Sequence, residues 1–311
     1  MIGIGGNRMS WAQLPAHVRS AVETLLGGPV VQAVSQPGGF SPGTADRVRT
    51  GAGRKAFVKA VSAAQNPDSP ALHRREFEIT AAMPANAPAP DVVGSFDDGE
   101  WIALVLEDVE GHVPVLPWTR PDVDAVLAAA ASLARMLTPS PVADLRRADD
   151  ELAEAFRGWH EIRDSPPADL DPWAREHLDL LCELAEAGSH SLEGATLCHT
   201  DMRADNVLLR PDGSVVFVDW PWASLGPPWL DTLMLLFNIR LYGGHDVEML
   251  LRKHCDASSA DVDGVLAGIS GFCTDAARRP DPPGLPALRA FQRAQAVVGV
   301  EWLRTRLGSG R

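Results

Sequence analysis

One stretch of the chain reads Leu197-Cys-His-Thr-Asp-Met-Arg-Ala-Asp-Asn-Val-Leu-Leu209, and Val215-Val-Phe-Val-Asp219 follows after a short gap. Phosphoryl transfer of the kinase type needs a carboxylate that accepts the proton of the attacking hydroxyl. It also needs an amide oxygen and a second carboxylate that hold magnesium against the nucleotide phosphates. Asp201, Asn206 and Asp219 fit these three roles in that order, so the stretch predicts a kinase-type active site.

The His-x-Asp-x4-Asn pattern that begins at His199 resembles that of the aminoglycoside phosphotransferase and choline kinase superfamily. Protein kinases carry Arg after this His and Phe-Gly after the second metal ligand, whereas this chain has Thr200 and Trp220 there. The resemblance implies an α+β, two-lobed, protein-kinase-like fold. It has a small antiparallel β-sheet lobe with one key helix, and a larger, mainly helical lobe. We expect residues 1–108 to form the nucleotide-binding lobe and residues 109–311 the catalytic and substrate-binding lobe.

Lysine is rare in this chain, and Lys59 stands in the apolar, strand-like run 56–61. Its compact charge suits a position between nucleotide phosphates better than the broad guanidinium of arginine. The resemblance makes Glu76, in the helical stretch 70–83, the residue that pairs with Lys59. Glu78 is the alternative partner. The two glutamates lie about 200° apart around a helix, so only one of them can face Lys59.

Two further segments are assigned to the nucleotide by the resemblance. Gly39 and Ser41 lie in a loop rich in glycine and proline, where backbone N–H groups can approach phosphate oxygens. Another apolar run ends at Leu106 and resembles the hinge between the lobes. The main chain of Glu107 and Val109 is then expected to bind the adenine edge, with Leu106 against the ring. On local composition alone, both segments read equally well as ordinary turns.

Four residues around the central loop have other expected roles. His199 is expected to bind the loop backbone rather than to act as an acid or base. Asp231, in Gly226-Pro-Pro-Trp-Leu-Asp231, matches a Gly-x-Pro-x-x-Asp segment of the family and is expected to brace the loop from the start of a helix. Arg203 and Asp205 are not part of the antibiotic-kinase pattern. Arg203 either steadies the transferring phosphate or pairs with a neighbour. The presence of both residues argues against a strictly aminoglycoside substrate.

Charge is unevenly distributed along the chain. Residues 1–60 hold seven Lys or Arg and two Asp or Glu, whereas the whole chain has a formal net charge of −13. This balance suits an anionic phosphate donor and a neutral or cationic acceptor, and it does not suit a nucleic-acid binder. Residues 141–190 hold 13 acidic and five basic residues. They read as a solvated helix face, or as the rim of a pocket for a polyamine-like acceptor.

No apolar run is long enough to span a membrane, and no basic start leads into an apolar signal stretch. We therefore expect a cytoplasmic protein without a membrane partner, either a monomer or a homodimer. Met9 reads as a natural beginning, with residues 1–8 as an extension. The four cysteines are expected to be reduced. Cys198 lies beside His199, but the further ligands of a zinc site are missing.

Hydrophobic periodicity predicts the order of the elements. In the first half we expect a helix, three strands, a second helix and two strands, near 16–26, 30–35, 45–50, 55–62, 70–83, 92–96 and 101–107. The second half is expected to be helical, near 121–139, 149–163, 172–187, 229–241, 245–255, 259–277 and 285–307. The stretch 197–219 is expected to be the only strand-like part of that half.

Together these features predict an enzyme that moves the terminal phosphate of ATP or GTP, with Mg²⁺, to a hydroxyl group of a small molecule. The acceptor is expected to be an aminoglycoside-like or other cationic antibiotic, which would make the protein a resistance enzyme. One alternative is a metabolic kinase for a sugar, an amino alcohol or a homoserine-like acceptor. Another is a nucleotide-binding regulator that keeps the fold without catalysis.

Overall fold

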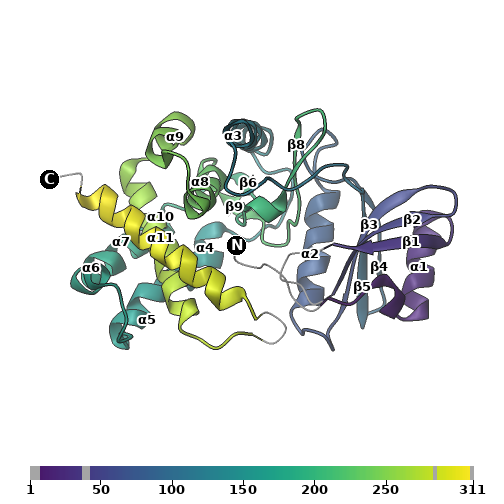
Figure 1. The fold of residues 1–311 in the computed structure, drawn as a ribbon, viewed down its shortest axis with the longest axis horizontal. Coiled ribbons are helices and arrows are strands. Elements are labelled where there is room, and N and C mark those ends of the chain that lie inside the picture. Colours follow the sequence, from purple (N-terminus) through teal and green to yellow (C-terminus); the bar gives the residue numbers. More distant parts are fainter. Residues whose placement is uncertain (1–7, 37–42, 283–285, 309–311) are drawn as a thin grey trace.

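A computed structural model of the chain describes residues 8–36, 43–282 and 286–308. The chain forms a small lobe built on a β-sheet and a larger, mainly helical lobe (Figure 1). This confirms the predicted two-lobed α+β fold. No helix in the described part is both long and apolar enough to cross a lipid bilayer.

The sheet of the small lobe has the strand order β1-β2-β3-β5-β4, and all its neighbouring strands are antiparallel. Short turns join β2 to β3 and β4 to β5, which favours antiparallel pairing of these strands. All five strands lie within two residues of the predicted positions. Their bounds are β1 (Val30–Ser35), β2 (Thr44–Thr50), β3 (Lys55–Ser62), β4 (Val92–Asp97) and β5 (Trp101–Leu106).

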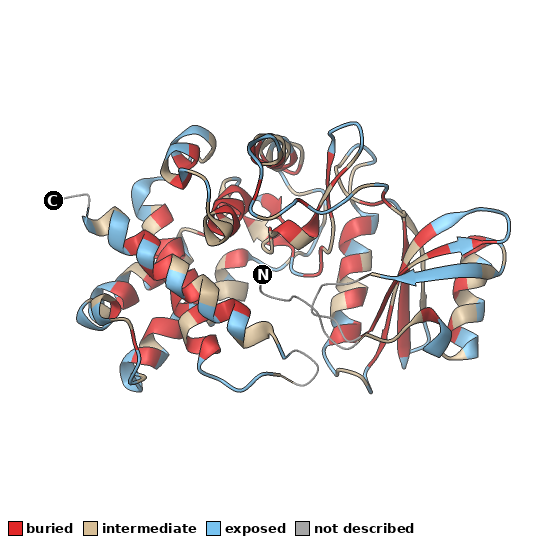
Figure 2. Ribbon diagram, viewed as in Figure 1, coloured by how far each residue is buried: buried red, intermediate tan, exposed pale blue. Residues whose placement is uncertain are grey.

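Two helices cover opposite faces of this sheet. All six side chains of β5 are buried, because α1 (Ala16–Leu26) packs on one face and α2 (Ser69–Ala81) on the other (Figures 1 and 2). Side chains alternate between the faces of a strand. In β3, Val58 packs in the core beneath α1, and Val61 packs on the α2 side. Lys59 has the same parity as Val61, so it faces α2 and the large lobe.

The large lobe packs its helices around a core that includes the fully buried Trp159, Trp220 and Trp302. Its helices are α3 (Arg120–Met136), α4 (Ala148–Ala153), α5 (Gly158–Asp164), α6 (Pro172–Glu176), α7 (Leu178–His190), α8 (Leu230–Tyr242), α9 (Val247–His254), α10 (Ser259–Ala277) and α11 (Leu288–Gly308). The chain also has three short 3₁₀ helices. One precedes α1, and the other two lie in the large lobe: η1 (Trp11–Gln13), η2 (Ala155–Arg157) and η3 (Ala204–Asn206).

Two expectations for the large lobe were wrong. The predicted helices over 149–163 and 172–187 are each divided, the first into α4, η2 and α5 and the second into α6 and α7. In addition, 197–219 is not the only strand-like part of this half. The short strand β9 (Ser224–Gly226) pairs with β6 (Thr196–Cys198), while β7 (Val207–Leu209) pairs with β8 (Val215–Phe217). A strand of three residues is too short to show an alternating pattern, and β9, unlike β6, β7 and β8, lies outside the stretch that the motif marks.

Helices α7 and α10 cross where both backbones carry glycine. A Cβ added at Gly188 would lie 2.2 Å from the backbone carbon of Gly264, so no side chain fits at this crossing. We expect Gly188→Ala to lower the free energy of unfolding by about 1–3 kcal/mol, because the packed helices must shift. Gly28→Ala is the control, since its Cβ would meet no atom within 4 Å. Urea unfolding measures both, and equal midpoints for the two variants would contradict the close crossing.

Candidate active site

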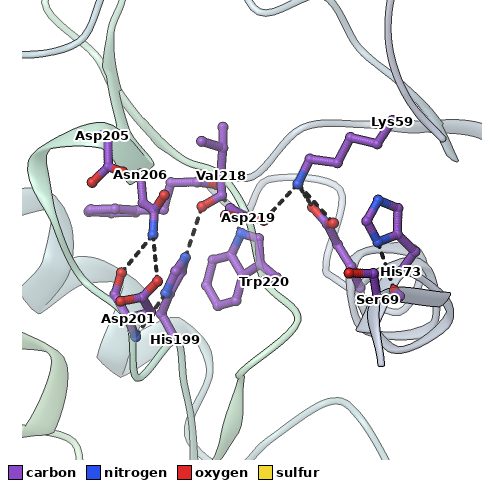
Figure 3. A network of polar contacts seen from close by, with 12 residues as sticks. Lys59, Ser69, His73, His199, Asp201, Asp205, Asn206, Val218, Asp219 and Trp220 are labelled. Carbon is purple, nitrogen blue, oxygen red and sulfur yellow. Dashed lines mark hydrogen bonds and ion pairs between the residues drawn. The ribbon is translucent and has the colours of Figure 1, made fainter. Parts of the chain in front are cut away.

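The loop between β6 and β7 is held in shape by a buried histidine. The Nε2 atom of His199 lies 3.0 Å from the carbonyl oxygen of Val218, and its Nδ1 lies 3.3 Å from the backbone nitrogen of Asp201 (Figure 3). The Asp201 N–H donates to Nδ1, so Nε2 carries the proton and donates to the carbonyl. The ring therefore links the loop to the end of β8, through its backbone contacts.

Asp231 supports the same loop from the first turn of α8. Its two carboxylate oxygens accept hydrogen bonds from the backbone N–H groups of His199 and Thr200, at 2.8 and 2.9 Å. Thr200 has a φ of 62°, a left-handed conformation that a β-branched residue rarely adopts. The two hydrogen bonds stabilise this strained backbone, as is common beside functional sites.

Asp201 and Asn206 contact each other across the loop. The amide nitrogen of Asn206 donates to the backbone carbonyl of Asp201 at 2.8 Å and to its carboxylate at 3.1 Å. Because the nitrogen is used in this way, the amide oxygen of Asn206 remains for a cation. Burial raises the pKa of Asp201, against the opposing effect of the Arg203 guanidinium, whose Nη1 lies 3.2 Å from the carboxylate.

Lys59 joins the two lobes. Its Nζ lies 2.7 and 2.8 Å from the carboxylate oxygens of Glu76 on α2, and 2.7 Å from Oδ1 of Asp219 in the large lobe (Figure 3). Burial would lower the pKa of Lys59, but Asp219 and Glu76 outweigh it and raise the value to about 12. Burial would raise the pKa of Asp219, but Lys59 outweighs it and lowers the value to about 2. Lys59 and Asp219 therefore form an ion pair at neutral pH, whereas burial raises the pKa of Glu76.

Glu76 rather than Glu78 faces Lys59. Glu76 is buried on the inner side of α2, whereas Glu78 is exposed on the outer side. His73 lies one turn earlier on the inner side. Burial and the charge of Lys59 lower its pKa to about 4, so it is neutral at pH 7. Of the two glutamates, only Glu76 can therefore orient the lysine.

We expect Glu76→Gln to reduce kcat/KM for ATP by about tenfold or more, the size seen for partners that orient site ligands. The neutral amide no longer holds the ammonium of Lys59 in place. Glu78→Gln is the matched control on the same helix and should behave as the wild type. Steady-state kinetics with varied ATP would measure the difference. Equal losses in the two variants would mean that Glu76 has no specific part in the site.

A cavity of about 820 Å³ lies beside this cluster and reaches the end of β5. Leu106, Glu107 and Val109 line it. The Glu107 N–H donates to the Asp91 carbonyl at 2.8 Å, and the Val109 carbonyl accepts from Arg47 at 2.8 Å. Within the described residues, this leaves the Glu107 carbonyl and the Val109 N–H for a ligand. The predicted Gly39 and Ser41 lie outside the described residues.

Sequence reasoning missed two arginines that line the cavity. Arg47 on β2 pairs with Asp108, with Nε and Oδ1 3.0 Å apart, and thereby fixes the hinge. Arg8 precedes the first helical turn, and burial lowers its pKa against the charges of Asp219 and Asp46. Neither residue belongs to a motif. Only the position of Arg47 within a strand of the nucleotide lobe could have indicated it.

Asn206 and Asp219 both line the cavity and offer oxygen ligands. Mg²⁺ in nucleotide sites takes one or two protein ligands and completes its shell with phosphate oxygens and water. The two residues fit this requirement. In the described ranges, no cluster of three or more His, Cys, Asp or Glu side chains could hold a metal ion. All four cysteines are free thiols, as expected.

Several solved structures have a fold similar to that of this chain. The chain aligns with an aminoglycoside phosphotransferase, a thermostable mutant of APH(4)-Ia bound to ADP and hygromycin B. The TM-score is 0.61 at 15% identity, over 95% of this chain and 99% of that one. The choline kinase LicA from Streptococcus pneumoniae aligns with a TM-score of 0.61 at 12% identity, over 94% and 98% of the two chains. Both likenesses show the fold.

An aminoglycoside phosphotransferase from Alicyclobacillus acidocaldarius also aligns, with a TM-score of 0.51 at 18% identity, over 90% of this chain and 93% of that one. No curated protein sequence matches the chain significantly. The sequence model of the phosphotransferase enzyme family, however, matches residues 38–265. This range holds Lys59, the loop between β6 and β7, and Asp219, and it covers well over half of the chain. The chain therefore belongs to the phosphotransferase enzyme family.

Proposed function

We propose that this protein transfers the terminal phosphate of ATP, with Mg²⁺, to a hydroxyl group of a small molecule. The observation that supports the proposal best is one connected cluster. Lys59 contacts both Glu76 and Asp219, and Asn206 holds the carboxylate of Asp201 in the adjoining loop. Kinase-type transfer needs these groups together, because catalysis depends mainly on positioning and on charge stabilisation.

Each residue has a distinct part in the proposed reaction. Lys59 would bind the phosphates, and Asn206 and Asp219 would hold Mg²⁺, which neutralises charge on the phosphate oxygens when bound. Asp201 would orient the acceptor hydroxyl and accept its proton. Alignment of this kind contributes on the order of 7–11 kcal/mol in favourable cases. The loop braced by Asp231 keeps the base in place.

The hinge favours adenine over guanine. Its free groups are a carbonyl acceptor at Glu107 and an N–H donor at Val109. The Watson–Crick edge of adenine offers an amino donor beside a ring-nitrogen acceptor and matches this order, whereas guanine offers an oxygen acceptor beside an N–H donor. We therefore propose ATP as the donor. We also propose that the boundary between the nucleotide-binding lobe, 1–108, and the lobe 109–311 lies at this hinge.

A transfer assay tests the proposal. The protein is incubated with Mg·ATP and a panel of aminoglycosides, cyclic peptides, sugars, choline and homoserine, and mass spectrometry detects a product heavier by one phosphate. Transfer to any acceptor, dependent on Mg²⁺, is the expected result. Tight nucleotide binding without transfer to any of them would favour the regulator that keeps the fold without catalysis.

A further inference from the structure

Arg203 joins two carboxylates of the catalytic loop. Its Nε and Nη2 each lie 3.0 Å from one oxygen of Asp205, and its Nη1 lies 3.2 Å from Oδ1 of Asp201. Only 16% of the arginine side chain is exposed, and the guanidinium lies 5.8 Å above the ring of Phe291 on α11. A paired contact of this kind fixes the guanidinium in its plane and offsets one of the two negative charges.

The other acidic side chains of the cavity beside Lys59 also contact basic side chains. Every carboxylate side chain in its described lining has the nitrogen of a lysine or arginine within 3.0 Å. The pairs are Glu76 with Lys59, Glu107 with Arg210, Asp108 with Arg47, Asp205 with Arg203, and Asp219 with Lys59. Each acid of this lining therefore already has a cationic neighbour, although Glu76 and Asp219 share the single charge of Lys59.

The cavity wall on the large-lobe side is mostly apolar. Val113, Leu116 and Tyr242 line it, as does Asp205. Val113 is 49% exposed, although aliphatic side chains are usually buried, and exposed apolar surface at a cavity often marks a binding site. No residue of 141–190 lines the cavity.

We propose that the acceptor is a neutral, partly apolar alcohol, and that Arg203 is the residue that excludes polycations from the site. The inference rests on the proposed phosphotransfer. A ligand with several ammonium groups needs unpaired carboxylates, and here it would have to displace the two-point contact between Arg203 and Asp205. The net charge of −13 does not by itself create a polycation site in the cavity, because the exposed charges are spread over the whole surface and are screened by salt.

Spermine serves as the polycationic probe, and calorimetric titrations without nucleotide measure its binding. We expect no saturable binding to the wild type at millimolar concentrations. Arg203→Met should bind spermine more tightly by about tenfold or more, because two partly buried carboxylates lose their cation. Arg146→Met is the control, since Arg146 pairs with Glu151 at 2.8 Å, is mostly exposed and does not line the cavity. It should bind spermine as the wild type does.

Arg203→Lys guards against a folding defect in Arg203→Met. Lysine keeps one charge but cannot contact both oxygens of Asp205 in one plane, so we expect an intermediate gain in spermine affinity. The inference is overturned if neither Arg203 variant gains affinity. It is also overturned if the wild type binds spermine saturably and Asp205→Asn abolishes that binding.

The two proposals can fail separately. If the wild type does not bind Mg·ATP, the phosphotransferase proposal is overturned. The spermine titrations would still report on the charge of the cavity. In the transfer assay, a preference for polycationic aminoglycosides over neutral glycosides of similar size would support phosphotransfer and overturn the neutral acceptor. Preferential phosphorylation of the neutral glycosides supports both.

Discussion

Asp201→Asn is expected to lower the rate of phosphate transfer by about 10²–10⁴-fold, the contribution of a positioned general base. The amide cannot accept the proton of the acceptor hydroxyl at neutral pH. It keeps the shape of the side chain, and its oxygen can still accept from the amide nitrogen of Asn206, which lies 3.1 Å from the carboxylate. Turnover with Mg·ATP and an identified acceptor measures the loss. Calorimetric titration with ATP should show nearly unchanged affinity.

The matched control is Asp212→Asn, the same substitution in the turn between β7 and β8. Asp212 is exposed and bonds only its neighbour Ser214 among the described residues, with Oδ1 2.7 Å from the Ser214 hydroxyl. We expect full turnover in that variant. If Asp201→Asn also turns over at the full rate, a different group must accept the proton, and the role assigned to Asp201 is wrong.

The small lobe follows closely from local sequence. Alternation in β3 and β5 determines which side chains face α2, and this alone orients Lys59 toward the cleft. Local sequence did not decide between Glu76 and Glu78 as the partner of Lys59. Helical periodicity puts the two glutamates on different faces of α2, but it does not say which face points inward. The pairing seen in the structure depends on how α2 packs against the sheet, and that is a tertiary property.

The helical lobe was less predictable because its breaks come from packing. The helix expected over 149–163 is interrupted by η2 before Gly158, where an added Cβ would lie 2.3 Å from the backbone of Gly271 on α10. The residues of this segment keep a continuous helical periodicity, so the local sequence gives no reason to expect an interrupted helix. Only the partner helix, more than a hundred residues later, makes the close approach necessary.

The central loop shows both limits at once. Spacing alone places Asp201 and Asn206 in one loop, and the structure brings their side chains into contact. The contact between Arg203 and Asp205 is the second of the two roles expected for Arg203, a pairing with a neighbour, but the spacing alone did not say which neighbour. Arg47 and Arg8 were missed for a related reason: their partners lie far away in sequence.

Asp219→Ala is expected to abolish Mg²⁺-dependent binding of ATP. Asp219 lines the cavity with Asn206, and the variant would leave a single protein oxygen for the metal. It also removes one of the two carboxylates that hold Lys59, which would keep its contact with Glu76. Calorimetric titrations with ATP, in Mg²⁺ and in EDTA, measure the effect. The wild type should bind more tightly in Mg²⁺, and the variant should bind weakly and equally in both.

A second substitution separates metal binding from folding. Asp219 has a φ of 71°, where alanine is strained but asparagine is tolerated. Asp219→Asn therefore keeps the backbone while it removes the negative charge that Mg²⁺ prefers. If both variants lose the difference between Mg²⁺ and EDTA, the carboxylate itself is the ligand. If Asp219→Asn keeps the wild-type difference, the loss in Asp219→Ala comes from a distorted backbone, and the metal must be held elsewhere.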